Sequence, residues 1–201
     1  MSTAVVVRKG AYAAIGADTL YKLGYTKESA ETVRSCSKIL KIGDSFFACV
    51  GDASGGLVFQ SYFSRLRRIP PLDSVQAIFE AARKMHKSLK EDYYLRPVEE
   101  KDDPFESSQI ECLIANASGI FGLYSLRSVQ EYSKFYAFGS GYRVALGAMH
   151  AAYAAASSAE EVARAGLEAA AEFDDGTGLP IEVHTLRLRD AARRPAREKR
   201  R

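Results

Sequence analysis

The chain has 201 residues, of which 47% are hydrophobic and 26% charged, a composition typical of a globular domain and unlike that of disordered or fibrous proteins. No apolar run approaches the roughly 18–20 residues that cross a membrane, and the apolar run near the N-terminus is too short for a signal peptide. Three cysteines without a CxxC pair indicate reduced thiols. These features exclude a membrane protein and a disulfide-rich secreted protein, and we expect a cytoplasmic one.

The formal net charge of +3 is unevenly distributed. Residues 187–201 contain eight basic and two acidic residues, so this segment carries +6 and the 186 residues before it carry −3. A basic terminal segment of this kind is typical of a flexible tail. We therefore expect one folded domain at 1–188 and a flexible tail at 189–201. No basic helix or basic aromatic face accompanies the tail, so no nucleic-acid partner is expected.

Hydrophobic periodicity predicts strands and helices in groups. In chain order, the sequence predicts strands at 3–7, 12–17 and 45–50, helices at 55–68 and 72–92, a hairpin of strands 109–114 and 119–124, a strand at 132–138, two helices within 140–172 that divide near 157–158, and a strand at 181–186. Strands in antiparallel groups and helices in pairs indicate an α+β fold rather than alternating β-α-β units. Two antiparallel sheets, with a helix pair on each outer side, would form a four-layer αββα sandwich.

The first eighteen residues, MSTAVVVRKGAYAAIGAD, contain the strongest indication of chemistry. Removal of Met1 would leave Ser2 with a hydroxyl and a free α-amine on one residue. The amine has an unperturbed pKa of about 7.7–8.0, so it can accept a proton near neutral pH. A nucleophile that carries its own base needs no histidine partner, which is the chemistry of N-terminal-nucleophile hydrolases.

The same segment resembles the start of proteasome β subunits and of the bacterial protease HslV, in which a hydroxyl residue opens the mature chain. Ser2, Thr3 and Asp18 fit that pattern without gaps. Further landmarks follow in the family's order: Lys38 opening an apolar strand, Gly51 in a small-residue turn, Gly139-Ser140-Gly141, and Asp174-Asp175-Gly176-Thr177-Gly178 with Thr in place of Ser. The chain most resembles the bacterial members close to HslV, including the stand-alone proteasome homologue of betaproteobacteria.

This resemblance implies how a catalytic centre would work. Ser2 Oγ would attack a peptide carbonyl while the Ser2 amine takes its proton, and Lys38 would lower the effective pKa of both groups. Asp18 would pair with Lys38 and keep it charged. The backbone N–H of Gly51, at a helix N-terminus, would donate to the developing oxyanion.

The resemblance also implies the surroundings of that centre. Three residues would lie around the Ser2 amine, namely Ser140, Asp174 and Thr177. Four others fall at substrate-contacting positions, namely Tyr21, Lys22, Cys49 and Ala53. Because Cys49 and Ala53 are small, we expect a roomy primary pocket.

Two departures from the family pattern affect these expectations. Serine at the nucleophile position lacks the methyl group that restricts χ1 of threonine, so its hydroxyl would be less well positioned. Asp52 follows Gly51 where a small neutral residue is common, and its carboxylate would oppose a developing oxyanion unless it points away or is paired. Lys41 is a rival to Lys38, but alternation along a strand places the two on opposite faces.

No other residues suggest a site. The three histidines, His86, His150 and His184, lie on separate elements without metal-ligand spacing. The acids at 99–103 are typical of a solvated loop, so no metal is expected. Neither a Walker motif nor GxGxxG is present, so no cofactor is expected and any ATP dependence would come from a partner ATPase.

The predicted function is that of a proteasome-like peptidase that hydrolyses peptides or unfolded proteins inside a ring. The resemblance implies a homo-oligomer of 12 or 14 subunits, without nucleic acid or membrane partners. The predicted helix pairs carry more aromatic side chains than one buried stripe per helix needs, which favours assembly through the helices. These residues are Phe59, Tyr62, Phe63, Tyr142 and Tyr153. The alternatives are a non-catalytic ring subunit of the same fold and an amidase acting on small molecules.

Overall fold

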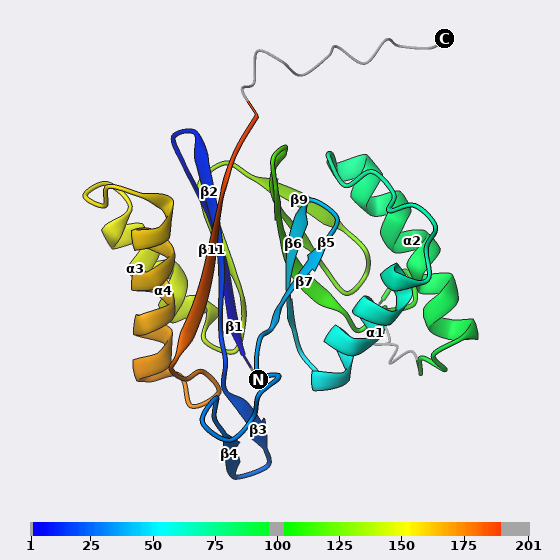
Figure 1. Cartoon of the computed structure of the whole chain (residues 1–201), viewed down its shortest axis with the longest axis horizontal. Helices are drawn as coiled ribbons and strands as arrows, with labels where there is room; N and C mark the ends of the chain where they lie inside the picture. Colours follow the sequence, from blue (N-terminus) through cyan, green and yellow to red (C-terminus); the bar gives the residue numbers. More distant parts are fainter. Residues whose placement is uncertain (1, 97–102, 190–201) are drawn as a thin grey trace.

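The computed structural model describes residues 2–96 and 103–189, whose strands build two main antiparallel sheets packed face to face (Figure 1). The first sheet has the order β10-β1-β2-β11, with β1 at Thr3–Lys9, β2 at Tyr12–Asp18, β10 at Phe135–Gly139 and β11 at Ile181–Arg187. The second has the order β5-β6-β7-β8-β9, with β5 at Ile39–Ile42, β6 at Ser45–Val50, β7 at Glu111–Asn116, β8 at Gly119–Leu123 and β9 at Val129–Tyr132.

A pair of helices covers the outer face of each sheet (Figure 1). Helices α3 (Tyr142–Ala152) and α4 (Ala159–Phe173) pack on the first sheet, and α1 (Ala53–Ser64) and α2 (Val75–Glu91) pack on the second. The predicted α+β fold with four αββα layers is therefore confirmed. No helix in the described part of the chain is both long and apolar enough to cross a membrane.

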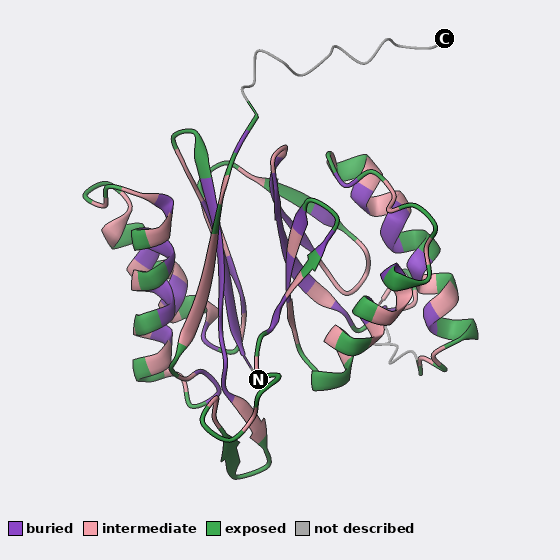
Figure 2. Cartoon of the chain, in the orientation of Figure 1, coloured by how far each residue is buried: buried purple, intermediate pink, exposed green. Residues whose placement is uncertain are grey.

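Strand β1 shows why the four layers form. Its side chains alternate between faces, so Ala4 and Val6 pack between the two sheets while Val5 and Val7 pack against α3 and α4. All four are fully buried, and Figure 2 shows the centre of this sheet buried along its length. A strand that is apolar on both faces requires a layer on each side.

Side-chain caps set the starts of three helices. Asp52 accepts a hydrogen bond from the backbone N–H of Ser54, so α1 begins at Ala53 rather than at the predicted residue 55. Ser74 caps α2, which begins three residues later than predicted, and Ser158 caps α4. These short polar residues satisfy backbone N–H groups that have no partner within the helix.

The single strand predicted at 132–138 is wrong. The chain forms β9 and β10 there, and the two strands belong to different sheets. Tyr132 and Tyr136 stack with ring centroids 4.4 Å apart across this crossing. Only Ser133 and Lys134 separate the aromatic residue that ends β9 from those of β10, and hydrophobic periodicity gives no signal for a change of sheet there.

A short ribbon of β3 (Tyr21–Leu23) and β4 (Thr26–Glu28) was not predicted. It extends beyond the sandwich at the end where the N-terminus lies (Figure 1). Its tip carries exposed residues, including Leu23 and Tyr25. Three-residue strands without a buried face leave no hydrophobic pattern, so periodicity could not reveal them.

The aromatic side chains of α1 are not surplus surface, contrary to expectation. Phe59 and Phe63 are only 1% and 5% exposed and pack against Phe47 in the core under α1 and α2. Tyr142 at the start of α3 and Tyr153 just after its end are half-buried against the core between the first sheet and its two helices. The expected tail beyond Arg189, and the acids at 99–102, lie outside the described residues.

Candidate active site

The hairpin of β1 and β2 brings the start of the chain beside Asp18. Its register pairs Ala4 with Ala17, so the next residue on each strand, Thr3 and Asp18, also meet. The backbone N–H of Thr3 donates to Asp18 Oδ1 at 2.9 Å. A two-residue turn with Gly10 at φ 59° closes the hairpin, and this tight turn fixes the register.

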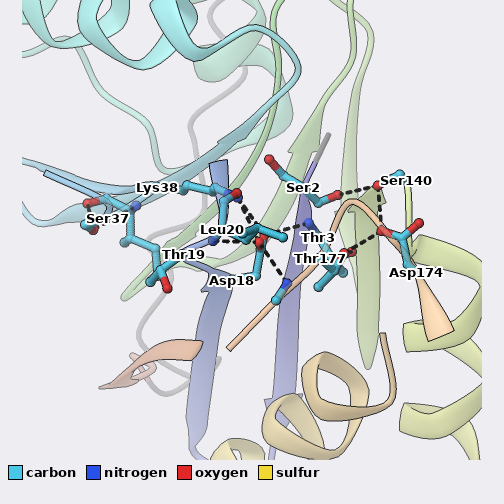
Figure 3. Close-up of polar contacts among 12 residues, drawn as sticks. Ser2, Thr3, Asp18, Thr19, Leu20, Ser37, Lys38, Ser140, Asp174 and Thr177 are labelled. Carbon is cyan, nitrogen blue, oxygen red and sulfur yellow. Dashed lines mark hydrogen bonds and ion pairs between the residues drawn. The ribbon is translucent and has the colours of Figure 1, made fainter. Parts of the chain in front are cut away.

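Asp18 lies at the centre of a buried hydrogen-bond network (Figure 3). Lys38 Nζ lies 2.9 Å from both carboxylate oxygens and donates to the carbonyl of Leu20 at 2.6 Å. Asp18 Oδ2 also accepts from the backbone N–H groups of Leu20 and Gly178, at 3.0 and 3.3 Å. The side chain of Asp18 is fully buried and that of Lys38 is 5% exposed. The ion pair is therefore shielded from water.

The surroundings of Lys38 affect its charge in opposite directions. Burial lowers the pKa of the Lys38 ammonium from its ordinary value, whereas the charge and hydrogen bonds of Asp18 raise it. The rival Lys41 is exposed, with Nζ 5.8 Å from the centroid of the Phe46 ring. The two lysines therefore lie in different environments, as the strand alternation predicts.

A second chain of hydroxyl groups reaches Ser2 from the other side (Figure 3). The backbone N–H of Ser140 donates to the Ser2 carbonyl at 2.8 Å, and Ser140 Oγ donates to Asp174 Oδ2 at 2.7 Å. Thr177 Oγ1 donates to the same Asp174 oxygen at 2.6 Å and lies 2.6 Å from Thr3 Oγ1. The predicted residues Ser140, Asp174 and Thr177 thus form one network that contacts both Ser2 and Thr3.

Two glycines allow the loop after β10 to approach the start of β1. Gly139 has φ 97°, and a Cβ at this position would lie 1.9 Å from the Ser2 carbonyl oxygen. A Cβ on Gly141 would lie 2.5 Å from Thr3 Oγ1. The Gly-Ser-Gly sequence is therefore needed here because the two backbones lie in close contact.

One cavity, of about 240 Å³, joins the remaining predicted residues. Ser2, Lys38 and Gly51 line it together with all four predicted substrate-contacting residues, Tyr21, Lys22, Cys49 and Ala53. Gly51 has φ 108°, a conformation that favours glycine, and it lies between the end of β6 and the start of α1. The Lys22 ammonium pairs with the exposed Asp175 carboxylate.

Asp52 lines the same cavity, but its carboxylate is engaged locally. Oδ1 accepts from the backbone N–H of Ser54 at 2.8 Å and from its hydroxyl at 2.6 Å. These hydrogen bonds lower the pKa of the Asp52 carboxyl from its ordinary value. The carboxylate therefore caps α1 and keeps its negative charge.

The histidines lie apart from this cavity. His86 Nδ1 lies 2.9 Å from Ser108 Oγ, and its Nε2 lies 3.2 Å from Glu106. His184 lies 2.7 Å from Glu182, and His150 is exposed on α3. Within residues 2–96 and 103–189, no three potential metal-ligating side chains gather at one point.

Sequence reasoning missed the backbone contributions to the network. The carbonyl of Leu20 and the N–H of Gly178 both contact the buried ion pair, and backbone groups carry no side-chain signal. It gave Thr3 a place in the family pattern but did not predict the contact of its hydroxyl with Thr177. Only the position of Thr3 next to Ser2 in the family pattern could have indicated it.

Comparison with solved structures gives the relatives of this chain. Thiobacillus denitrificans BPH is 49% identical, with a TM-score of 0.89 over 94% of this chain and 99% of that chain. The same protein in complex with epoxomicin gives a TM-score of 0.88 over 93% and 99%. Eukaryotic HslV from Trypanosoma brucei, 21% identical with a TM-score of 0.65 over 92% and 99%, shares the fold. Neither the protein-family models nor the curated proteins gave a match.

Proposed function

The chain belongs to the proteasome- and HslV-type family of N-terminal-nucleophile hydrolases, alongside Thiobacillus denitrificans BPH, and we propose that it is a peptidase whose nucleophile is Ser2 after removal of Met1. The observation that carries this proposal is the buried ion pair of Lys38 and Asp18 beside the cavity that Ser2 lines. Burying two charges is costly. The pair is retained because catalysis needs a positive charge on Lys38.

Ser2 supplies both the nucleophile and the general base in this mechanism. Its hydroxyl attacks the peptide carbonyl, and its α-amine takes the hydroxyl proton and later returns a proton to the leaving amine. The hydrogen bonds from Ser140 hold the Ser2 carbonyl in place. Asp174 accepts a hydrogen bond from the Ser140 hydroxyl and another from the Thr177 hydroxyl, so this network orients the residue that reacts.

Lys38 contributes a positive charge without transferring a proton. An ammonium close to Ser2 favours the alkoxide that forms as the hydroxyl loses its proton. Asp18 keeps Lys38 protonated and fixes its direction through contacts with both carboxylate oxygens. Because the pair is shielded from water, its field at Ser2 is stronger than that of an exposed lysine.

The oxyanion of the tetrahedral intermediate would be stabilised at the start of α1. Gly51 lines the cavity with Ser2 and lies just before the start of α1, so its backbone N–H is the donor that our mechanism assigns to the oxyanion. The substrate side chain would enter between Tyr21, Cys49 and Ala53. These residues leave room for a large side chain in the 240 Å³ cavity.

We propose further that the protein works in the cytoplasm as a homo-oligomeric ring of 12 or 14 subunits that degrades peptides or unfolded proteins. Membership in a family of ring-forming peptidases supports this assembly. Exposed apolar residues near the cavity also favour it, since Leu57 on α1 and Leu23 on the β3–β4 ribbon are 70% and 75% exposed. Apolar side chains of this size commonly lie at interfaces.

The test combines mass spectrometry with peptide hydrolysis by the purified full-length protein. We expect an intact mass that begins at Ser2, and fluorogenic peptide cleavage that Ser2→Ala abolishes without changing oligomer size. Epoxomicin, which is bound by Thiobacillus denitrificans BPH, should inhibit the wild type and leave Ser2→Ala unlabelled. Retained Met1 on active protein would contradict the mechanism. Hydrolysis of small amides by a monomer would favour the amidase alternative, and assembly without turnover would favour the non-catalytic subunit.

A further inference from the structure

Two cysteines lie directly opposite each other beside the candidate active site. Cys49 on β6 pairs with Cys112 on β7 in the antiparallel register of the second sheet. Directly opposite residues in such a pair have Cα atoms about 4.5–5.5 Å apart, and disulfides span Cα separations of about 4.4–6.8 Å. Both thiols are free. The register therefore places the two cysteines within the range of Cα separations that a disulfide spans.

The two thiols share one face of the sheet but differ in access. Cys112 is fully buried in the core beneath α1 and α2, and Cys49 packs against the same core from its edge. Cys49 also lines the cavity that contains Ser2, and it lines a second cavity, of about 260 Å³, beside it. A small oxidant in the cavity can therefore reach Cys49 and not Cys112.

The chemical states of the thiols fit this order of events. A hydrogen bond with Cys49 and complete burial raise the pKa of the Cys112 thiol. Cys112 therefore stays protonated until Cys49 has been oxidised. Thiol oxidation begins with attack of a cysteine sulfur on the oxidant, so the accessible Cys49, and not the buried Cys112, reacts first.

We propose that Cys49 and Cys112 form a reversible dithiol modification site, oxidised by a hydroperoxide, that controls the cavity in which Ser2 lies. In the first step the Cys49 sulfur attacks the peroxide, the O–O bond breaks, and Cys49 sulfenic acid forms with release of an alcohol or water. In the second step the Cys112 sulfur attacks the Cys49 sulfur, and the sulfenic oxygen leaves as water with the Cys112 proton. Overall two thiols lose two electrons and the peroxide gains them.

The disulfide would alter the cavity because of where Cys49 lies. Bond formation draws its sulfur from the cavity wall toward Cys112, and it fixes the end of β6 two residues before Gly51. A displacement of a catalytic group by about 1 Å costs up to about a hundredfold in rate. We therefore expect oxidation to lower peptide turnover by about tenfold or more, a consequence that depends on the proposed function.

The test oxidises the assembled full-length protein with hydrogen peroxide and maps the cysteines by peptide mass spectrometry. We expect a Cys49–Cys112 link, a fall from three titratable thiols to one, and recovery of thiols and turnover with dithiothreitol. Cys36→Ser is the matched control and should keep the link. Cys49→Ser and Cys112→Ala should each abolish it, with folding of both checked by oligomer size and thermal unfolding.

The outcomes separate this proposal from the proposed function. A link from Cys36, or oxidation of Cys49 to a sulfinic acid without any link, would overturn the dithiol site. A complete Cys49–Cys112 link with unchanged turnover would refute the claim that the disulfide controls the cavity. Absence of turnover in the fully reduced protein would contradict the peptidase proposal, and the mass measurement would still decide whether the dithiol site exists.

Discussion

Replacing Asp18 by asparagine tests the electrostatic core of the mechanism, because it keeps the shape and removes the charge. In the wild type, Oδ1 accepts from Thr3 and Lys38, and Oδ2 accepts from Lys38, Leu20 and Gly178. An asparagine amide can accept at only one of these positions. Whichever way it turns, an NH₂ group would face at least two groups that donate.

The contacts give the size of the expected effect. Removal of one partner from a buried ion pair costs about 3–5 kcal/mol of stability. This range already includes the cost of leaving hydrogen-bond donors without an acceptor. Without Asp18, the largest influences that raise the pKa of Lys38 are gone while burial still lowers it, so the pKa falls further below its ordinary value. A smaller fraction of Lys38 then carries the positive charge beside Ser2 at a given pH, and we expect turnover to drop by about 10²–10³, as for loss of one group that stabilises a developing charge.

The assay is peptide hydrolysis by the assembled protein as a function of pH. The mechanism needs Lys38 protonated, and a lysine with a lower pKa loses its proton at lower pH. The basic limb of the kcat/KM profile should therefore move to lower pH in Asp18→Asn. Asp175→Asn is the matched control, since Asp175 pairs with Lys22 at the surface, and it should leave the basic limb in place. Wild-type turnover with an unshifted profile in Asp18→Asn would refute the reasoning.

Four further outcomes are expected. Ser2→Thr should keep or raise peptide turnover relative to Ser2, because threonine offers the same hydroxyl with a restricted χ1; a silent Thr variant would point to another nucleophile. Lys38→Ala should lower turnover by orders of magnitude and the exposed Lys41→Ala should not; the reverse result in the hydrolysis assay would place the wrong lysine at the site. Gly139 has φ 97°, and the Cβ of Gly139→Ala would lie 1.9 Å from the Ser2 carbonyl oxygen. The backbone strain of this variant, at least about 1–3 kcal/mol, should lower the melting temperature, and the variant should also have impaired turnover. Light scattering should show a ring of 12 or 14 subunits, and a fully active monomer would exclude a chambered peptidase.

Much of the fold was predictable because its strands and helices are encoded locally. The hairpin of β1 and β2 follows from two apolar runs around a glycine turn. The hairpin of β7 and β8 joins the two segments that were predicted to form one. Helix pairs between strand groups predicted the four layers. The prediction failed where the local sequence pattern carries no information, namely at the change of sheet between Tyr132 and Phe135 and at the exposed β3–β4 ribbon.

The candidate site was predictable in composition but not in geometry. Resemblance placed Ser2, Asp18 and Lys38 together, and the structure brings Asp18 and Lys38 into a buried ion pair. The contribution of Leu20 and Gly178 comes from backbone groups, which leave no trace in residue identity. Their roles depend on the path of the chain around Asp18.

The sequence by itself determined which segments are strands or helices and which residues have the chemistry of an N-terminal-nucleophile site, because periodicity and side-chain type are local properties. Only the tertiary structure decided which of those residues touch. Thr3 and Thr177 lie 174 positions apart and their hydroxyls are 2.6 Å apart, and Cys49 meets Cys112 across two strands separated by two helices. Such contacts follow from the packing of four layers, in which burial of apolar faces sets the register of strands distant along the chain.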